Sequence, residues 1–330
     1  MTFETADAAC DVHAVIVNYQ SARFAIDCLR ALEAERGNGL GIIVTLVDSF
    51  SQDDSVRQLE DEIQAQSWQS WVSMMRLPSN RGFAAANNQA IKAAKKWQSP
   101  PEYTLLLNPD TKVRSGAIGS LLRVLKQQPQ VGIVGSRLEW ENGKGQRAAR
   151  RFPSIASELE STLQLGIATR LLRGSVVAPE EPAGTAETDW VVGASMMIRN
   201  SIFDDIGYLD EDYFLYFEEV DFCFRAWKAG WRIWFVPESR VIHYVGSSTG
   251  VTSSESRARC PAYWFESRRR YFLKNQGRLT LIAANIASLM GLSWSSFRDK
   301  VSNTSRIKHE RFLYDFIRYN FLSFRRVDTA

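Results

Sequence analysis

The first half of the chain alternates short apolar runs with segments whose apolar residues recur every three or four positions. The runs are rich in β-branched residues, which is typical of buried strands, and the spacing between them is typical of amphipathic helices. The expected strands cover residues 14–17, 42–47, 72–77 and 103–107, and helices are expected around 25–32, 56–63, 84–95 and 118–125. This alternation predicts a parallel sheet wound as βαβ units, with helices on its faces.

Polar residues follow each of these predicted strands. In chain order they are Asn18-Tyr19, Asp48-Ser49, Asn80-Arg81-Gly82 and Asn108-Pro109-Asp110. The carboxyl ends of parallel strands meet at one edge of a sheet, where α/β proteins bind their ligands. The pattern therefore predicts a binding site built from all four loops.

The later part of the chain is less regular between residues 137 and 188, where a hairpin-like Asn142-Gly143, a basic patch (Arg147, Arg150, Arg151) and a Pro/Glu/Gly loop occur. A strand is expected over 190–198. A helix is expected from Glu218 to Gly230, with Val220, Cys223, Phe224 and Trp227 as its buried stripe, followed by strands over 231–236 and 240–243. The sequence contains no internal repeat and no low-complexity segment.

Charge divides the chain into two parts. Residues 251–330 hold 15 basic and 6 acidic side chains, whereas residues 1–250 hold 25 basic and 31 acidic ones. The basic part suits an anionic surface. The apolar stretch Leu279 to Leu292 is fourteen residues long, which is short of the roughly 20 that span a bilayer. The sequence leaves open whether it forms a helix in the membrane interface or one packed on the main domain.

Cysteine usage and the first residues bear on the compartment. The four cysteines are far apart and form no Cys-x-x-Cys pair, which disfavours a disulfide framework or a zinc site and fits a reducing compartment. The first eleven residues include Glu4, Asp7 and Asp11 and lack the order of a signal peptide. These observations favour a cytoplasmic protein.

Several positions could carry chemistry. Asp110 ends a predicted strand, where its carboxylate could hold a hard divalent cation, although Asp is also common in turns. His243 follows a later strand and could be either a ligand or a hydrogen-bonded structural residue. Glu218, Glu219 and Asp221 share one helical turn, so crowding could make one of them a general base, or all three could simply favour the helix dipole.

The loop from Asn80 to Asn87 enters a helix and combines an arginine, a glycine and small residues, so it could bind a phosphate. It matches neither the Walker loop nor Gly-x-Gly-x-x-Gly, which disfavours a nicotinamide enzyme.

In this order, the motifs resemble family 2 glycosyltransferases of the GT-A fold, in particular the bacterial rhamnosyltransferase-like branch. The resemblance covers residues 13–250 and rests on Val15 to Tyr19, Val47 to Ser51, Asn80 to Asn87, Leu107 to Asp110, Gly193-Ala194, Phe214 to Asp221 and Ala229 to His243. It implies a Rossmann-like, mostly parallel sheet over 1–250, with a nucleotide-sugar half (1–115) and an acceptor and catalytic half (116–250). Residues 251–330 would form a helical, basic extension that associates with a membrane.

The resemblance also implies a function and its residues. The chain would be an inverting, metal-dependent glycosyltransferase of the hexosyltransferase type that uses Mg²⁺ or Mn²⁺. It would take one sugar, rhamnose by this branch, from a nucleotide diphosphate to a glycan or lipid-linked acceptor in surface polysaccharide synthesis. The implied donor residues are Val17, Tyr19, Asp48, Asn80, Arg81, Gly82, Asn87, Asn108 and Asp110. The implied acceptor residues are Trp190, Gly193 and Glu218, the catalytic ones Glu219 and Asp221, and the metal ligands Asp110 and His243.

Two positions depart from the family pattern. The family more often has aspartate where Glu219 stands, and Asn108 replaces a first aspartate of the metal motif.

Other functions fit less well. A nucleotidyltransferase would carry a glycine-rich basic loop where this chain reads Asn18-Tyr19-Gln20-Ser21, and a processive synthase would carry Gln-x-x-Arg-Trp and several membrane spans. A non-catalytic nucleotide-sugar-binding protein would not need Asp110, Glu219 and His243 together. No nucleic-acid recognition motif accompanies the basic tail, so nucleic acid is not an expected partner. The expected location is cytoplasmic and peripheral to the inner membrane.

Overall fold

The four strands predicted in the first half pair in parallel and form one half of the main sheet. A computed structural model describes residues 10–244, 259–302 and 309–322. These strands are β1 (Val12–Asn18), β2 (Ile42–Asp48), β3 (Val72–Arg76) and β4 (Tyr103–Leu107), in the spatial order β3-β2-β1-β4. The first two crossovers each place the next strand beside the preceding one, and the crossover through α3 (Phe83–Ala94) then returns the chain to the other side of β1, where β4 pairs.

The other half of the sheet is mixed. Beyond β4 the order continues β10-β6-β11-β5, with β8 paired to β11. These strands are β5 (Thr111–Val113), β6 (Val131–Glu139), β8 (Ala186–Glu187), β10 (Ser195–Arg199) and β11 (Arg232–His243). β10 runs antiparallel to β4 and β6, whereas β11 runs parallel to β6. The predicted parallel sheet is thus confirmed in its first half and extended by a mixed second half.

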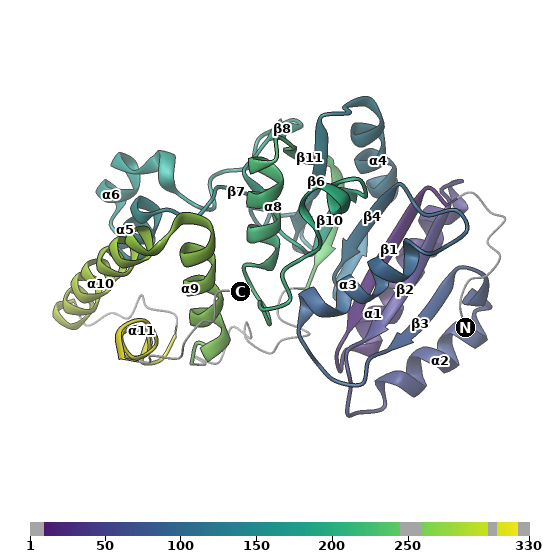
Figure 1. The fold of residues 1–330 in the computed structure, drawn as a ribbon, viewed down its shortest axis with the longest axis horizontal. Helices are drawn as coiled ribbons and strands as arrows, with labels where there is room; N and C mark the ends of the chain where they lie inside the picture. The colour runs from purple at the N-terminus through teal and green to yellow at the C-terminus, as the bar shows by residue number, and fades with distance from the viewer. Residues whose placement is uncertain (1–9, 245–258, 303–308, 323–330) are drawn as a thin grey trace.

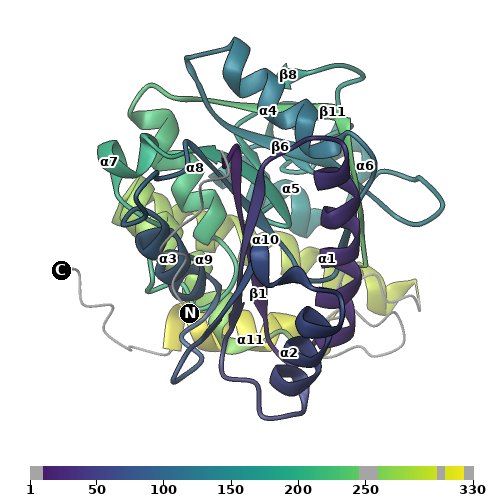
Figure 2. The same ribbon diagram turned by 90° about the vertical axis from the view of Figure 1, so that its right-hand side faces the viewer.

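Helices cover both faces of the sheet (Figures 1 and 2). One face packs against α1 (Ala22–Gly37), α2 (Ser55–Ala65) and α4 (Ala117–Gln127), and the other against α3 (Phe83–Ala94), α7 (Ile202–Ile206) and α8 (Glu218–Lys228). The alternation of β1 explains the division, since Ala14 and Ile16 belong to the first core and Val15 to the second.

The C-terminal part of the described chain is helical. It contains α9 (Ala262–Gln276), α10 (Arg278–Val301) and α11 (Phe312–Ile317), which pack with α5 (Ile155–Leu163) and α6 (Gly166–Leu171) at the end of the molecule away from β1–β3 (Figure 1). A small core of Cys260, Phe265, Leu292 and Phe316 joins α9, α10 and α11. The predicted boundary at residue 250 lies outside the described residues, as do the first nine residues and several basic positions of the predicted extension.

Three predictions about these elements were wrong in detail. The strand expected over 190–198 is two strands, because the chain leaves β9 (Trp190–Val191), which pairs with β7 (Ala149–Arg150), and enters β10 in the main sheet. The two strands expected over 231–243 are one strand, β11, whose register shifts between Val236 and Arg240. That interval contains Pro237, which has no N–H to donate.

The third error concerns exposure. Trp227 was expected in the buried stripe of α8 but is 52% exposed, while its ring contacts Phe152 and Phe224 at the surface.

Helix α10 is longer than the apolar stretch that predicted it. It has 24 residues, and among the described residues it is the one helix long and apolar enough to cross a membrane by length and composition. One side packs closely on α5, since a Cβ added at Gly291 would lie 2.1 Å from the Thr162 hydroxyl oxygen. The opposite side is exposed and apolar, at Leu279, Ile282, Ile286, Met290, Trp294, Phe297 and Val301. The helix is thus packed on one side, and its exposed apolar side leaves the interfacial alternative as a prediction.

Candidate functional site

A cavity of about 540 Å³ opens at the carboxyl edge of the sheet. Ten of the residues singled out in the sequence line it: Val17, Tyr19, Asn80, Gly82, Asn108, Asp110, Gly193, Glu218, Glu219 and His243. The volume is in the range that suits a small-molecule ligand. Strand register explains part of this convergence, because β1 and β2 pair so that Asn18 lies opposite Asp48 and both strands end together.

Asp48 does not line this cavity. Its carboxylate is buried and accepts hydrogen bonds from Asn18 Nδ2 at 2.8 Å and from the Ser51 backbone N–H at 3.0 Å and hydroxyl at 2.6 Å. These bonds tie together the loops that follow β1 and β2. The neighbouring Ser49 lines the cavity instead.

Three other predicted residues also lie outside the cavity wall. Arg81 points to Glu211 at 3.1 Å and its side chain is largely exposed. Asn87 is buried in α3, where its amide donates to the Phe83 carbonyl at 2.9 Å. Trp190 donates its indole N–H to the Arg151 carbonyl at 2.8 Å, and the Arg150 guanidinium lies over its ring. Each has a structural partner that explains its position.

Asp110 and His243 come together through sheet pairing. β5 follows Asp110 and runs antiparallel to the end of β11, so His243 pairs with Thr111 and lies beside Asp110. The distance from His243 Nε2 to Asp110 Oδ1 is 3.5 Å, and the His243 Nδ1 lies 3.2 Å from Gln146 Oε1. Within the described residues, Asp110 Oδ1 is buried without a hydrogen-bond partner.

This pair could hold a divalent cation. A buried carboxylate oxygen without a partner is costly, and a bound cation would satisfy it, as carboxylate and imidazole are both metal ligands. No group of three or more His, Cys, Asp or Glu side chains able to hold a metal occurs among the described residues. The protein would thus supply two ligands, and a bound diphosphate or water would have to supply the rest.

Glu218 and Glu219 begin helix α8 and line the same cavity as this pair. Burial raises the pKa of both carboxyls, and the charge of Glu219 raises the pKa of Glu218 further. Backbone hydrogen bonds, one of them with Gly193, and the positive charge of Arg150 counteract part of the effect at Glu219. Among the described residues, the Oε2 atoms of both side chains lack hydrogen-bond partners. A carboxylate that faces a cavity in this state can accept a proton.

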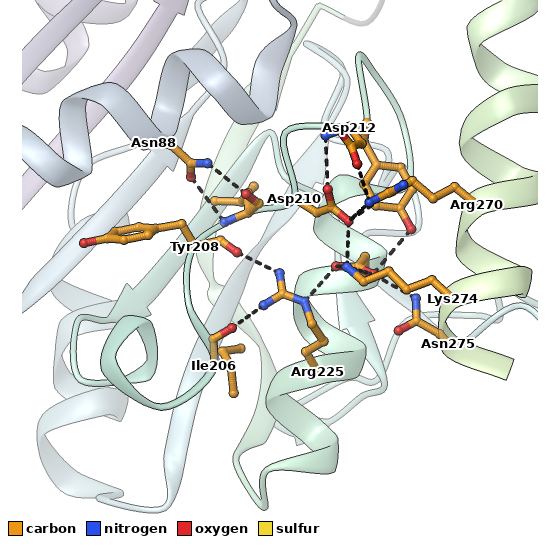
Figure 3. Close-up of polar contacts among 12 residues, drawn as sticks. Asn88, Ile206, Tyr208, Asp210, Asp212, Arg225, Arg270, Lys274 and Asn275 are labelled. Atoms are coloured by element: carbon orange, nitrogen blue, oxygen red, sulfur yellow. Dashed lines mark hydrogen bonds and ion pairs between the residues drawn. The ribbon is translucent and has the colours of Figure 1, made fainter. Parts of the chain in front are cut away.

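Asp221 lies on the same helix but outside the cavity. Its fully buried carboxylate accepts hydrogen bonds from Arg225 Nε at 2.8 Å and Asn275 Nδ2 at 2.8 Å, and Lys274 Nζ lies 2.9 Å away. Lys274 and Arg270 also bind Asp210, so this ion-pair network joins α9 to α8 and to the loop before it (Figure 3). All of these partners of the Asp221 carboxylate join structural elements, and none of them lines the cavity.

The loop before α8 has an unusual backbone. Tyr216 and Phe217 have φ angles of 70° and 69°, in the left-handed region that residues other than glycine rarely adopt. Each such residue costs about 1–3 kcal/mol and persists only when surrounding contacts hold it. The Phe214 carbonyl accepts a hydrogen bond from the Phe83 N–H at 3.0 Å, and this oxygen would lie 2.0 Å from a Cβ at Gly82. Gly82 is therefore needed for this close approach.

Nine further residues of the cavity wall had been given no individual role from the sequence: Ser49, Phe83, Pro109, Val192, Ala194, Phe214, Leu215, Tyr216 and Tyr263. Seven of them lie within the motifs that predicted the site, and Val192 adjoins one of these motifs. Tyr263 had no such signal, because it comes from α9, outside the segment that the motifs covered.

The chain matches the family model described as glycosyltransferase-like family 2 over residues 9–263. Among curated proteins it is similar to N-acetylglucosaminyl-diphospho-decaprenol L-rhamnosyltransferase of Mycobacterium tuberculosis, with 31% identity over 177 residues, or 52% of this chain and 55% of the relative. It is also similar to rhamnosyltransferase WbbL of Escherichia coli K12, with 28% identity over 49% of this chain and 61% of that relative. The matched region thus spans little more than half the length of these relatives.

Two solved structures share the fold. One is GalNAc-T7 with UDP, GalNAc and Mn²⁺, with a TM-score of 0.53 and 15% identity over 72% of this chain and 44% of that one. The other is the mannosyltransferase PcManGT of Pyrobaculum calidifontis with GDP-Man and Mn²⁺, with a TM-score of 0.53 and 13% identity over 90% and 76%. At these identities the likeness concerns the fold alone, and it confirms the predicted GT-A architecture.

Proposed function

This chain belongs to glycosyltransferase-like family 2, and from that premise we propose that it transfers one sugar from a nucleotide diphosphate to an acceptor hydroxyl, with inversion at the sugar carbon. The observation that carries the proposal is the placement on one cavity of two carboxylates that each have a buried oxygen without a hydrogen-bond partner among the described residues. They belong to Asp110, which stands beside His243, and to Glu219. The reaction needs both a site for the departing diphosphate and a base for the acceptor.

The donor would lie along the carboxyl edge of the sheet. Val17, Tyr19 and Ser49 would line the nucleoside end, and Asn80 and Gly82 would continue the wall toward the phosphates. Asp48 would act indirectly, since its hydrogen bonds to Asn18 and Ser51 fix the two loops that form this end. This indirect role replaces the donor contact that the family resemblance implied for Asp48.

Asp110 and His243 would hold a divalent cation such as Mg²⁺ or Mn²⁺ at the diphosphate. When bound, the cation would neutralise negative charge that develops on the leaving nucleotide diphosphate. The residues fit this role because a buried carboxylate oxygen without a partner lies 3.5 Å from an imidazole nitrogen on the cavity wall. Gln146 would orient the imidazole through its contact with Nδ1.

Glu219 would act as the general base. The acceptor oxygen forms its bond to the anomeric carbon while the bond from that carbon to the diphosphate oxygen breaks, and the acceptor proton passes to Glu219. The attack comes from the face opposite the leaving group, so the configuration inverts. General-base assistance of this kind is worth about 10²–10⁴ in rate. Asp221 would serve as a structural anchor of α8, because its oxygens are fully engaged with cations and an amide.

The donor sugar and acceptor are proposed from the relatives. The names of two similar proteins specify rhamnosyl transfer, and one of them specifies N-acetylglucosaminyl-diphospho-decaprenol. We therefore propose thymidine diphosphate rhamnose as donor and a lipid-linked, diphosphate-bearing glycan as acceptor, in the synthesis of a surface polysaccharide.

A peripheral position at the inner membrane would bring the enzyme to such an acceptor. The exposed face of α10 carries seven large apolar residues at helical spacing, and the last 80 residues of the chain are strongly basic. An apolar helix face beside basic residues favours an anionic membrane surface. Since the other face of α10 packs on α5, the helix would lie on the membrane rather than cross it.

The experiment measures release of thymidine diphosphate from its rhamnose conjugate by the purified protein. Release should stop in excess chelator and return with Mn²⁺ or Mg²⁺. Asp110→Ala should weaken donor binding in the presence of metal and matter much less without it, and the exposed Asp27→Ala should behave like wild type. Full activity in excess chelator would contradict the metal site. The absence of any donor turnover would favour a non-catalytic nucleotide-sugar-binding protein. Conversion of the donor and added inorganic diphosphate to thymidine triphosphate and rhamnose 1-phosphate would favour a nucleotidyltransferase.

A further inference from the structure

Three aromatic rings from two distant segments meet on the cavity wall. Phe214 and Tyr216 belong to the loop before α8, and Tyr263 belongs to the first turn of α9. The ring centroids of Phe214 and Tyr263 are 5.4 Å apart with a tilt of 51°, and those of Tyr216 and Tyr263 are 6.0 Å apart and stacked. Phe214 remains 40% exposed although it is a large apolar side chain. A hydrophobic ring left open in a cavity is available to a ligand.

Helix α9 is fixed to this loop by polar contacts that do not involve the rings. The Ser267 hydroxyl donates to the Leu215 carbonyl at 3.1 Å, one turn along α9 from Tyr263. Farther along, Arg270 and Lys274 bind Asp210 at 2.8 Å and 2.7 Å (Figure 3). The position of Tyr263 relative to Phe214 and Tyr216 is thus set by contacts at both ends of the loop.

The loop is equally fixed to the other wall and to the acids. The Phe214 carbonyl is bonded to the Phe83 N–H beside Gly82, and the left-handed backbone at Tyr216 and Phe217 turns the chain directly into Glu218. The rings therefore stand next to the carboxylate pair at the start of α8. A strained backbone that holds aromatic side chains beside a candidate base indicates a functional arrangement.

We propose that Phe214, Tyr216 and Tyr263 form a platform that binds the sugar ring of the acceptor and thereby determines acceptor specificity. This inference rests on the proposed sugar transfer. The faces of aromatic rings are electron-rich, so the C–H groups on the apolar face of a pyranose can pack on them while its hydroxyls stay free for hydrogen bonds. Burial raises the pKa of Tyr216 to about 12 and also raises that of Tyr263, so both hydroxyls stay protonated and can donate to the sugar.

The position of the platform favours the acceptor over the nucleotide. Val17, Tyr19 and Ser49, which follow β1 and β2, would take the nucleoside end of the donor. The platform instead adjoins Glu218 and Glu219, and the base must contact the acceptor hydroxyl. The platform is also assembled partly from α9, so the C-terminal helices contribute directly to the binding site.

The test is a comparison of steady-state constants for the full chain with thymidine diphosphate rhamnose and N-acetylglucosaminyl-diphospho-decaprenol in detergent. Tyr263→Ala and Tyr263→Leu should raise the acceptor KM about tenfold, with the donor KM unchanged, because an aromatic contact of this size corresponds to about one order of magnitude in affinity. Tyr263→Phe keeps the ring and removes only the hydroxyl, so it should raise the acceptor KM by less than Tyr263→Ala does. Tyr19→Ala provides the opposite case and should raise the donor KM alone. A second readout is equilibrium binding of the acceptor in the presence of thymidine diphosphate, which requires no turnover.

The outcomes separate this inference from the function on which it rests. If Tyr263→Ala and Tyr263→Leu leave the acceptor KM unchanged, or raise the donor KM instead, the proposed platform is wrong while the proposed sugar transfer is unaffected. Acceptor binding that depends on Tyr263 without any transfer supports the platform and contradicts the proposed reaction. A wild-type protein that neither binds nor glycosylates the acceptor overturns both. Urea unfolding of Tyr263→Leu, expected to match wild type, excludes a loss of folding as the cause.

Discussion

The two sides of helix α8 place chemically similar acids in opposite environments. On the cavity side, Glu218 and Glu219 have raised pKa values because they are buried, and their Oε2 atoms have no hydrogen-bond partner within the described part of the chain. On the packed side, two residues farther along, Asp221 is surrounded by Arg225, Lys274, Asn275 and the Tyr213 hydroxyl. The first environment favours proton uptake. In the second, the carboxylate is held by ion pairs and hydrogen bonds.

This difference shows that the role of an acid depends on its surroundings more than on its place in a motif. All three residues lie in the first turn of one helix, and the helix dipole acts on each of them. Only the cavity side offers room for a substrate. The packed side uses its charge to bind α9, so the same turn of helix holds both a candidate base and an anchor for the C-terminal helices.

The largest expected effect comes from removing the base on the cavity side. Glu219→Gln should lower the transfer rate at least about a hundredfold and leave the donor Kd nearly unchanged, because the base acts in the transition state. Glu218→Gln is the matched control and should cost far less, since a buried Glu218 that stays protonated has the same charge as glutamine. Initial rates and donor binding for both variants provide the measurement. Equal losses in the two variants would contradict the assignment.

Removing the acid on the packed side of α8 should lower the stability of the protein. Asp221→Asn leaves Arg225 and Lys274 without their buried anion, which should lower the free energy of unfolding by about 3 kcal/mol or more. Urea unfolding monitored by tryptophan fluorescence measures this change. Asp212→Asn is the control, because its carboxylate contacts the same network from an exposed position. If Asp221→Asn abolished transfer but kept wild-type stability, Asp221 would have to be assigned a catalytic role in place of a structural one.

The raised pKa of Glu218, on the cavity side of α8, should also make the stability of the protein depend on pH. Glu218 has a raised pKa in the folded protein, so the folded state holds a proton that the unfolded state has lost. Stability from this group is therefore present below the ordinary glutamate pKa of about 4.3 and is lost as pH rises toward the raised folded value. Relative to wild type, Glu218→Gln should gain stability as pH increases through this window. Unfolding midpoints between pH 4 and pH 8, in steps of about one unit, test this, and a parallel pH dependence in both proteins would contradict it.

The smallest expected effect on catalysis concerns α10, where a packed and an open face again differ. Replacing Ile286, Met290 and Phe297 on the open face with glutamine should weaken binding to vesicles that contain anionic phosphatidylglycerol by about tenfold or more, because apolar area no longer enters the interface. Hydrolysis of soluble donor should not change. Trp140→Gln removes an exposed aromatic residue elsewhere and serves as control. Equal vesicle binding by wild type and the triple variant would contradict the proposal that this face of α10 binds a membrane.

Much of the fold could be predicted from the sequence because its signals are local. The strands that end at Asn18, Asp48 and Leu107 have continuous apolar runs, and their polar ends mark the edge of the sheet. The break at residues 192–194 could not be predicted, since a change of sheet depends on which strands are neighbours and not on periodicity. The apolar stretch ends at Leu292, but α10 continues to Val301 through polar residues, of which Arg298 donates to the Leu163 and Gln164 carbonyls at the end of α5.

The cavity was predicted less completely than the fold. Motif order placed Asp110, Glu219 and His243 near one another, but it could not tell that Asp221 turns away, because that depends on Lys274 and Asn275 from α9. Tyr263 was missed for the same reason. Contacts between segments distant in the chain decide these roles, and they leave no local signal in the sequence.

The most direct test of sugar transfer with Glu219 as base is a product measurement across a panel of nucleotide sugars. Wild-type protein, Glu219→Gln and Asp221→Asn would each be incubated with N-acetylglucosaminyl-diphospho-decaprenol, Mn²⁺ and each nucleotide sugar in turn. The mass of the lipid product would be measured by mass spectrometry. The account predicts that wild-type protein adds one sugar from thymidine diphosphate rhamnose, that Asp221→Asn does so whenever it is folded, and that Glu219→Gln does so at least about a hundredfold more slowly. Product formed equally well by wild-type protein and Glu219→Gln, or no product from any donor, would contradict it.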